Sequence, residues 1–280
     1  MITHERERRK GSVPGWYCPG MNEHPSEQSR ARSFGRVVAA YDSGRPSYPR
    51  DAVDWLTGST PTRVLELGAG TGKLTEQLVG AGHTVVATDP TEPMLRRLAE
   101  QVPAARPVLA VAEQIPLAAG SVGVVVAAQS FHWFDPARAL PEAARVLRPD
   151  GVLSVVWNSR DERIPWVRRL GAIIGDAGHT VDPTPEIEAS GLFHPVEAST
   201  FRFWQSLTRE SLRDLVRSRS DIALMSDLDR DRVLRKVDDL YEEYGRGADG
   251  MLLPYLTRTF RATVLARTEM DTDALLIDFR

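Results

Sequence analysis

Three glycines at alternate positions follow a short apolar run and give this sequence its clearest chemical signal. The segment reads Val64-Leu65-Glu66-Leu67-Gly68-Ala69-Gly70-Thr71-Gly72. Glycine has no side chain and adopts positive φ at little cost, so such a turn lets a ligand approach the backbone closely. Glu66 stands two residues before the first glycine and adds a carboxylate for a cationic or hydroxyl-rich ligand. We therefore expect a small-molecule site at this turn.

Three ligand classes compete for the glycine turn, and the spacing of its residues separates them. A phosphate-binding P-loop needs a glycine, four residues, and then Gly-Lys-Ser/Thr. A loop that ended at Gly72-Lys73 would have Leu67 in place of the first glycine and Leu74 in place of the hydroxyl residue. A dinucleotide fingerprint needs another glycine three positions after the second, where this chain has Lys73. The class that remains is a nucleoside without phosphate.

A second candidate carboxylate is Asp89, which ends the next apolar run. An acid about 20 residues beyond a glycine turn can accept hydrogen bonds from both ribose hydroxyls. Because Pro90 follows, Asp89 also suits the N-cap of the next helix, and the two roles are compatible.

Alternating strands and helices must position these groups. Apolar and β-branched runs predict strands at 62–67, 84–88, 108–111, 122–128 and 152–157, with helices near 72–81, near 91–101 and after Asp135-Pro136. We expect Pro149-Asp150-Gly151 to form the turn before the last of these strands. This order predicts a doubly wound α/β domain with a parallel sheet, in which ligands bind beyond the carboxyl ends of the strands.

The flanking segments extend this plan. Residues 30–57 are expected to form two short lid helices, and 165–175 a further helix. Residues 193–204 look extended, 208–218 and 229–244 look helical with solvated charged faces, and 251–264 reads as a final strand. The expected organisation is one domain over 31–280, with its cofactor core at about 60–160 and a helical cap insertion at about 205–250. Residues 1–30 lack periodicity and predict a disordered extension, and Met21 is an alternative start.

The glycine turn and its surroundings resemble the class I S-adenosylmethionine-dependent methyltransferases. The first motif of that family resembles Glu66-Leu67-Gly68-Ala69-Gly70-Thr71-Gly72, and Asp89 occupies the position of the family's ribose-binding acid. The other matching segments are Val111-Ala112-Glu113-Gln114-Ile115-Pro116-Leu117 beside the adenine, Ala127-Ala128-Gln129-Ser130 beside the methionine part of the cofactor, and Leu147-Arg148-Pro149-Asp150-Gly151 before the fifth strand. Phe131-His132-Trp133-Phe134-Asp135, with Arg45-Pro46-Ser47-Tyr48-Pro49 upstream, is most similar to the small-molecule branch that includes trans-aconitate methyltransferases. Gly123 departs from the aspartate usual at its position, and we expect a structural reason.

The resemblance implies a Rossmann-like, seven-stranded, mostly parallel sheet and a set of site residues. The implied S-adenosylmethionine ligands are Glu66, Gly68, Ala69, Gly70, Gly72, Asp89, Met94, Ala112, Glu113, Gln129 and Tyr41. Arg45, Tyr48, Trp133 and Arg160 are the candidate substrate residues, and Arg163 is a further possible carboxylate ligand. His132 is the candidate general base, with a hydrogen-bonded loop histidine as the alternative. Three other candidates also have structural alternatives. Met94 can be a core residue, Glu113 a solvated surface residue, and Trp133 a packing residue.

Composition narrows the expected partners and location. The formal net charge is −3, which gives no field that would attract nucleic acid or an anionic membrane. A single cysteine, Cys18, fits a reducing, cytoplasmic setting. The histidines and cysteine show no metal-ligand spacing, so no metal is expected. Together with this composition, the resemblance implies transfer of a methyl group by in-line displacement to a small-molecule acceptor, at a carboxylate or hydroxyl oxygen. A non-catalytic S-adenosylmethionine-binding regulator is the alternative.

Overall fold

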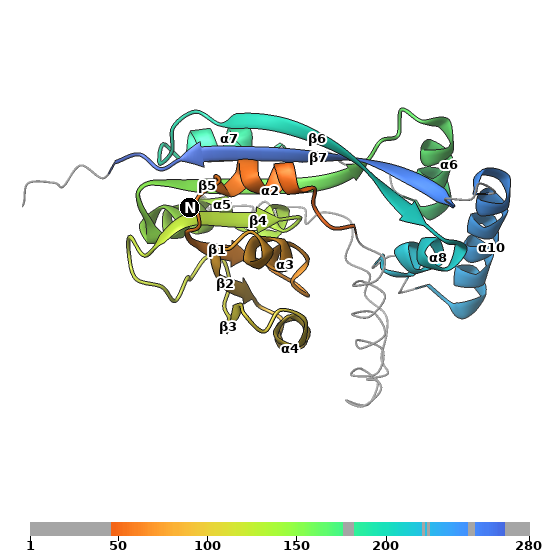
Figure 1. Cartoon of the computed structure of the whole chain (residues 1–280), viewed down its shortest axis with the longest axis horizontal. Helices are drawn as coiled ribbons and strands as arrows, with labels where there is room; N and C mark the ends of the chain where they lie inside the picture. The colour runs from red at the N-terminus through yellow and green to blue at the C-terminus, as the bar shows by residue number, and fades with distance from the viewer. Residues whose placement is uncertain (1–45, 176–181, 220–221, 223–224, 246–249, 267–280) are drawn as a thin grey trace, which may run out of the picture.

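A seven-stranded sheet forms the centre of the molecule (Figure 1). The computed structural model describes residues 46–175, 182–219, 222, 225–245 and 250–266. The strands are β1 (Arg63–Leu67), β2 (Thr84–Asp89), β3 (Arg106–Leu109), β4 (Val122–Ala128), β5 (Leu147–Arg160), β6 (Glu197–Leu207) and β7 (Met251–Thr263). Their order is β3-β2-β1-β4-β5-β7-β6. The first five strands in this order are parallel to one another, and β7 is antiparallel to both of its neighbours, β5 and β6. The predicted mostly parallel, seven-stranded sheet is confirmed.

Helices cover both faces of this sheet. They are α2 (Arg50–Thr57), α3 (Lys73–Gly80), α4 (Glu92–Gln101), α5 (Pro136–Val146), α6 (Pro165–Ile174), α7 (Thr184–Ala189), α8 (Arg209–Arg217) and α10 (Asp227–Tyr244), with a 3-10 turn, η1, at Phe131–Trp133. In Figure 1, α2 and α3 lie in front of the sheet and α5 and α7 behind it. One buried cluster joins α2, α3 and α4 to the sheet and a second joins α5 and α7 to its other face. Burial on both faces explains the almost wholly apolar sequence of β4.

The helix α5 begins as its sequence predicts. Asp135 is its N-cap and accepts a hydrogen bond from the Ala137 backbone N–H at 3.1 Å, and Pro136 occupies the first helical position. Both features follow from general preferences at helix N-termini.

Three local predictions need correction. The third strand is Arg106–Leu109, two residues earlier than expected, because it pairs with β2 until Leu109 lies opposite Asp89. The expected turn around Asp150 is instead an irregular stretch inside β5, where pairing with β4 shifts register and Asp150 has φ 60°. The six-residue helix α7 was not predicted, since it is too short to show a period.

The helices α8 and α10 lie between β6 and β7 in the chain and pack with α6 at one end of the molecule (Figure 1). Each has a buried apolar stripe beneath its charges: Leu212, Leu215 and Val216 in α8, and Leu234, Val237 and Leu240 in α10. These residues join Leu253 and Tyr255 of β7 in a third buried cluster. We call α6, α8 and α10 the cap.

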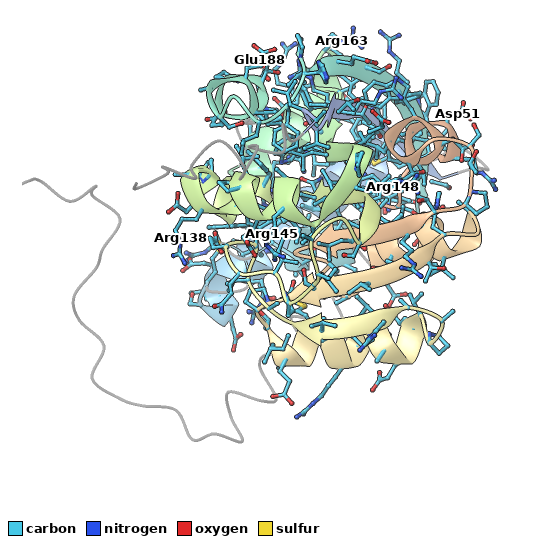
Figure 2. All side chains as sticks on the ribbon, turned by 90° about the vertical axis from the view of Figure 1, so that its left-hand side faces the viewer. Asp51, Arg138, Arg145, Arg148, Arg163 and Glu188 are labelled. Atoms are coloured by element: carbon cyan, nitrogen blue, oxygen red, sulfur yellow. The ribbon has the colours of Figure 1, made fainter. Side chains whose placement is uncertain are left out.

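The opposite end of the sheet explains Gly123. Figure 2 looks onto this end, with Arg145 and Arg148 near its centre. A Cβ atom on Gly123 would overlap the Thr62 hydroxyl and lie 3.1 Å from the Arg148 guanidinium carbon. Gly123 therefore has the structural role expected of it, because a side chain there would displace Thr62 or Arg148.

Candidate cofactor site

The turn between β1 and α3 has the backbone that its glycines predict. Gly68, Gly70 and Gly72 have φ of 67°, 57° and 95°. A Cβ on Gly68 would lie 2.6 Å from Ser130 Cβ, and one on Gly72 would lie 3.0 Å from Leu98 Cγ. A Cβ on Gly70 would meet nothing within 4 Å. The side-chain positions of Gly68 and Gly72 are thus filled by protein, whereas that of Gly70 faces open space that a ligand can enter.

The end of β2 fixes this turn. The Ala69 N–H donates to the Thr88 carbonyl at 2.9 Å, and the Gly70 N–H donates to Asp89 Oδ2 at 2.9 Å. The other carboxylate oxygen, Asp89 Oδ1, accepts from the Thr91 N–H at 2.8 Å. Each oxygen keeps a second lone pair, so Asp89 can hold the turn and still accept from ribose. The N-cap of α4 is Thr91, so the N-cap alternative for Asp89 is wrong.

Glu66 is a buried carboxyl beside the glycine turn. Its side chain is 1% exposed and accepts a 2.6 Å hydrogen bond from the Thr75 hydroxyl. Burial raises the pKa of Glu66 to about 8; the bond from Thr75 opposes this shift, and the charge of Asp89 adds to it. A cationic ligand group beside this carboxyl would favour its ionised form and so offset the cost of its burial.

One cleft collects much of the predicted cofactor site. Its lining includes the predicted residues Glu66, Gly68, Ala69, Gly70, Gln129 and Tyr48. The sequence analysis did not assign the other lining residues, Pro46, Thr71, Lys73, Leu74 and Ala128. Most of these lie within one or two positions of an assigned residue, which is the signal that could have identified them.

Gln129 borders the cleft in a strained backbone conformation. It has φ 57°, a left-handed value that is uncommon for a residue other than glycine. Its backbone N–H donates to Val156 O at 2.9 Å, and its side-chain Nε2 donates to Asn158 O at 3.1 Å. Such strain persists where surrounding contacts over-determine it, and it concentrates at functional sites.

Five of the predicted cofactor residues that the structure describes lie outside that lining, Asp89 among them. Gly72 is the N-cap of α3, and Met94 is half-buried in the first turn of α4. Ala112 is buried, and Glu113 Oε1 accepts a 2.8 Å hydrogen bond from the Asp135 N–H. Glu113 is therefore not simply solvated, since it ties the loop after β3 to the start of α5. The adenine contacts expected of Met94, Ala112 and Glu113 stay predictions.

His132 and Trp133 lie in η1, just after β4. Ser130 precedes them and donates from its hydroxyl to Leu67 O at 2.7 Å, which holds this turn beside Gly68. The His132 and Trp133 rings are 4.7 Å apart, and both side chains are exposed. Partial loss of hydration lowers the pKa of His132. Trp133 is 80% exposed, so it does not have the packing role considered for it.

The candidate substrate arginines differ in placement. Arg160 is half-buried at the end of β5 and lies opposite Tyr255 of β7. Arg163 forms a two-point ion pair with Asp161, with distances of 2.6 Å and 2.5 Å, so its guanidinium is already engaged. Tyr41 and Arg45 lie outside the described residues, and their predicted roles stay predictions.

These features fit S-adenosylmethionine. A glycine cradle and a buried carboxyl line one cleft, and a second carboxyl, Asp89, is hydrogen-bonded to that cradle at Gly70. Within the described ranges, no group of three or more His, Cys, Asp or Glu residues could hold a metal ion. No helix in the same part of the chain has the length and apolar content to cross a membrane.

Comparisons with known proteins agree with this geometry. A family profile described as "Methyltransferase domain" matches residues 65–155. An uncharacterised methyltransferase of Mycobacterium tuberculosis is 46% identical over 244 residues, which is 85% of this chain and 98% of the relative. A malonyl-[acyl-carrier protein] O-methyltransferase of Methylococcus capsulatus is 38% identical over 134 residues, covering 44% of this chain and 48% of that enzyme.

Solved structures show the same fold. A protein from Anabaena variabilis, assigned as a methyltransferase of an antibiotic biosynthesis pathway, superimposes with a TM-score of 0.61 at 20% identity, over 79% of this chain and 99% of that one. Taken with the near-complete alignment to the mycobacterial relative, this fold and the geometry of the cleft lead to one conclusion. The chain belongs to the class I S-adenosylmethionine-dependent methyltransferases, and S-adenosylmethionine is its cofactor.

Proposed function

We propose that this enzyme transfers the methyl group of S-adenosylmethionine to an oxygen atom of a small molecule, and that the acceptor is a carboxylate. The observation that carries the proposal is the position of Arg160. Asn158 and Arg160 are two residues apart on β5, so their side chains lie on the same face of the sheet. Asn158 contacts Ser47, which lies between the cleft residues Pro46 and Tyr48. Arg160 lies opposite Tyr255, which belongs to the buried cluster that joins β7 to the cap. These neighbours support a position of Arg160 between the cofactor cleft and the cap.

The chemistry of arginine supports a carboxylate acceptor. A guanidinium presents several N–H donors in a plane that matches the two oxygens of a carboxylate. The name of the Methylococcus relative also describes an O-methyltransferase. A net charge of −3 supports a small molecule over nucleic acid as the acceptor, and a single cysteine supports a cytoplasmic setting.

A carboxylate acceptor asks little of the protein beyond alignment. Bound S-adenosylmethionine supplies an electrophilic methyl group on a sulfonium. The acceptor oxygen forms the new bond to the methyl carbon, and the carbon–sulfur bonding electrons leave with sulfur. Glu66 and Asp89 hold the cofactor, Tyr48 and Pro46 wall the cleft, and Arg160 orients the acceptor. An ionised carboxylate has no proton to lose, so no general base is required, and good orientation can contribute about 7–11 kcal/mol to lowering the barrier.

A hydroxyl acceptor is the second candidate, and the lowered pKa of His132 favours it. A hydroxyl must lose a proton during transfer, and a neutral imidazole can accept it. His132 follows β4 at the carboxyl edge of the sheet, on the same side as the cleft residue Gln129.

The dependence of rate on pH separates these two acceptors. For a carboxylate acceptor we expect the rate at saturating S-adenosylmethionine to stay constant between pH 6 and about 8, and we expect His132→Ala to retain most activity. A rise with an apparent pKa below the usual histidine value of about 6.5, lost in His132→Ala, would instead identify a hydroxyl acceptor and a catalytic histidine. The measurement is the initial rate of tritium transfer from methyl-labelled S-adenosylmethionine.

The labelled product gives a direct test of the acceptor atom. The enzyme is incubated with labelled cofactor and the low-molecular-mass fraction of a cell extract, and the product is then treated with mild alkali. A methyl ester releases volatile labelled methanol, whereas a methyl ether or amine keeps its label. We expect alkali-labile label that falls at least tenfold in Arg160→Gln. Alkali-stable label would contradict the carboxylate proposal, and no label in any fraction would favour the non-catalytic regulator.

A further inference from the structure

We propose that Asn158 is a positioning residue for the cofactor, because its side-chain amide holds the segment Pro46–Pro49 against the cofactor cleft. We call this segment the strap. Two strap residues, Pro46 and Tyr48, line the cleft. Tyr48 is 8% exposed and belongs to the buried cluster that contains Ala69 and Leu74 of the same cleft. The inference rests on the cofactor site, not on the proposed acceptor.

The hydrogen bonds of Asn158 fix the orientation of its amide. Its Nδ2 donates to the Ser47 carbonyl at 3.1 Å, and its Oδ1 accepts from the Thr257 hydroxyl at 2.7 Å. A carbonyl can only accept, so the nitrogen must face Ser47 and the oxygen must face Thr257. Thr257 is fully buried in β7, opposite Asn158 in register. The strap is therefore tied through one amide to the interior of the sheet.

The backbone of Asn158 positions a second wall of the cleft. Its carbonyl accepts the 3.1 Å bond from Gln129 Nε2. Gln129 also lines the cleft and is held at φ 57°. The residue that anchors the strap is thus the one that holds the side chain of Gln129. Displacing Asn158 would loosen the cleft on both sides.

Three features make the Ser47 contact important for binding rather than for folding. Ser47 is exposed and precedes α2, and Tyr48 is the one buried residue among the four of the strap. The bond joins residues 111 positions apart. Because the strap borders the cleft without forming the sheet, its release would expose Tyr48 and open the site while leaving the strands paired.

The test is calorimetric titration with S-adenosylhomocysteine. Asn158→Ala is expected to weaken binding about tenfold, the effect of losing roughly one hydrogen bond and the order it imposes. Asn158→Asp keeps an acceptor for Thr257 but places an oxygen against the Ser47 carbonyl, so it should weaken binding at least as much. Ser159→Ala, which changes the next side chain on the opposite face of β5, should bind like the wild type.

Hydrogen exchange distinguishes this role from a general loss of stability. In the presence of saturating S-adenosylhomocysteine, peptides covering 46–57 should exchange faster in Asn158→Ala than in wild type, while peptides of β1 and β4 should not change. Unchanged affinity in Asn158→Ala and Asn158→Asp, or faster exchange spread evenly over the sheet, would overturn the proposal. Failure of wild type itself to bind would instead refute the cofactor assignment.

Discussion

Replacing Glu66 with glutamine should weaken S-adenosylhomocysteine binding about 10- to 100-fold, the range for losing a hydrogen bond to a charged group. The carboxyl of Glu66 is almost fully buried, and burial raises its pKa to about 8. In the empty site it is therefore mainly protonated at neutral pH. The ammonium group of the ligand favours the ionised form, so binding should release a proton between pH 6 and 8. Titrations in buffers of different ionisation enthalpy measure that proton.

The same change should make the ligand-free protein more stable at high pH. Since the pKa of Glu66 is raised on folding, the native state binds more protons than the unfolded state between pH 4.5 and about 8. Its contribution to stability is complete below that window and declines as pH rises through it, by a few kcal/mol in all. Glu66→Gln removes this decline, and Glu76→Gln, an exposed glutamate of α3, should not. Parallel pH profiles of the free energy of unfolding for wild type and Glu66→Gln would contradict the buried, protonated carboxyl.

Gly68→Ala is expected to destabilise the fold by about 3 kcal/mol, from overpacking together with left-handed strain. The new Cβ would lie 2.6 Å from Ser130 Cβ and 2.9 Å from Ser130 Oγ, at a residue with φ 67°. Gly70→Ala provides the matched control, because its Cβ would meet nothing within 4 Å at φ 57°. The control should lose only about 1–2 kcal/mol from its left-handed backbone.

Gly68→Ala should lose more stability than Gly70→Ala, whereas Gly70→Ala should show the direct loss of ligand binding. Gly70 lines the cleft, so its added methyl group occupies ligand space, and Gly70→Ala should fold while losing S-adenosylhomocysteine binding. The double variant Gly68→Ala with Ser130→Gly should recover the part of the lost stability that comes from the clash. Urea unfolding followed by calorimetry measures both effects. Equal urea midpoints for wild type and Gly68→Ala would show that the turn is not enclosed as described.

The strands, the glycine turn and much of the cleft follow from local sequence. The run Val122–Ala128 is apolar enough to require burial on both faces, and Asp135-Pro136 begins a helix by its own chemistry. The positive φ values of the glycine turn follow from its residue types. The family motifs then place Gln129 beside the turn, where the structure has it.

The remaining contacts depend on register and on distant chain segments, which local patterns do not encode. The link between Asn158 and Ser47 spans 111 positions, and the bond from Thr75 to Glu66 depends on how the first turn of α3 faces the sheet. The bond from Asp135 to Glu113 depends on how two loops meet at the sheet edge. The third strand was misplaced for the same reason, since its pairing with β2 sets its ends. Trp133 is exposed in η1, against the packing role that the sequence analysis allows for it.

The most direct test of the cofactor assignment is a calorimetric titration of the purified protein with S-adenosylhomocysteine, with NAD as the control ligand, repeated on Asp89→Ala. Asp89 accepts hydrogen bonds from Gly70 and Thr91 and keeps lone pairs for ribose, so the variant should bind at least tenfold more weakly. The account predicts micromolar binding of S-adenosylhomocysteine by the wild type and none of NAD. Absence of S-adenosylhomocysteine binding, or a preference for NAD, would contradict it.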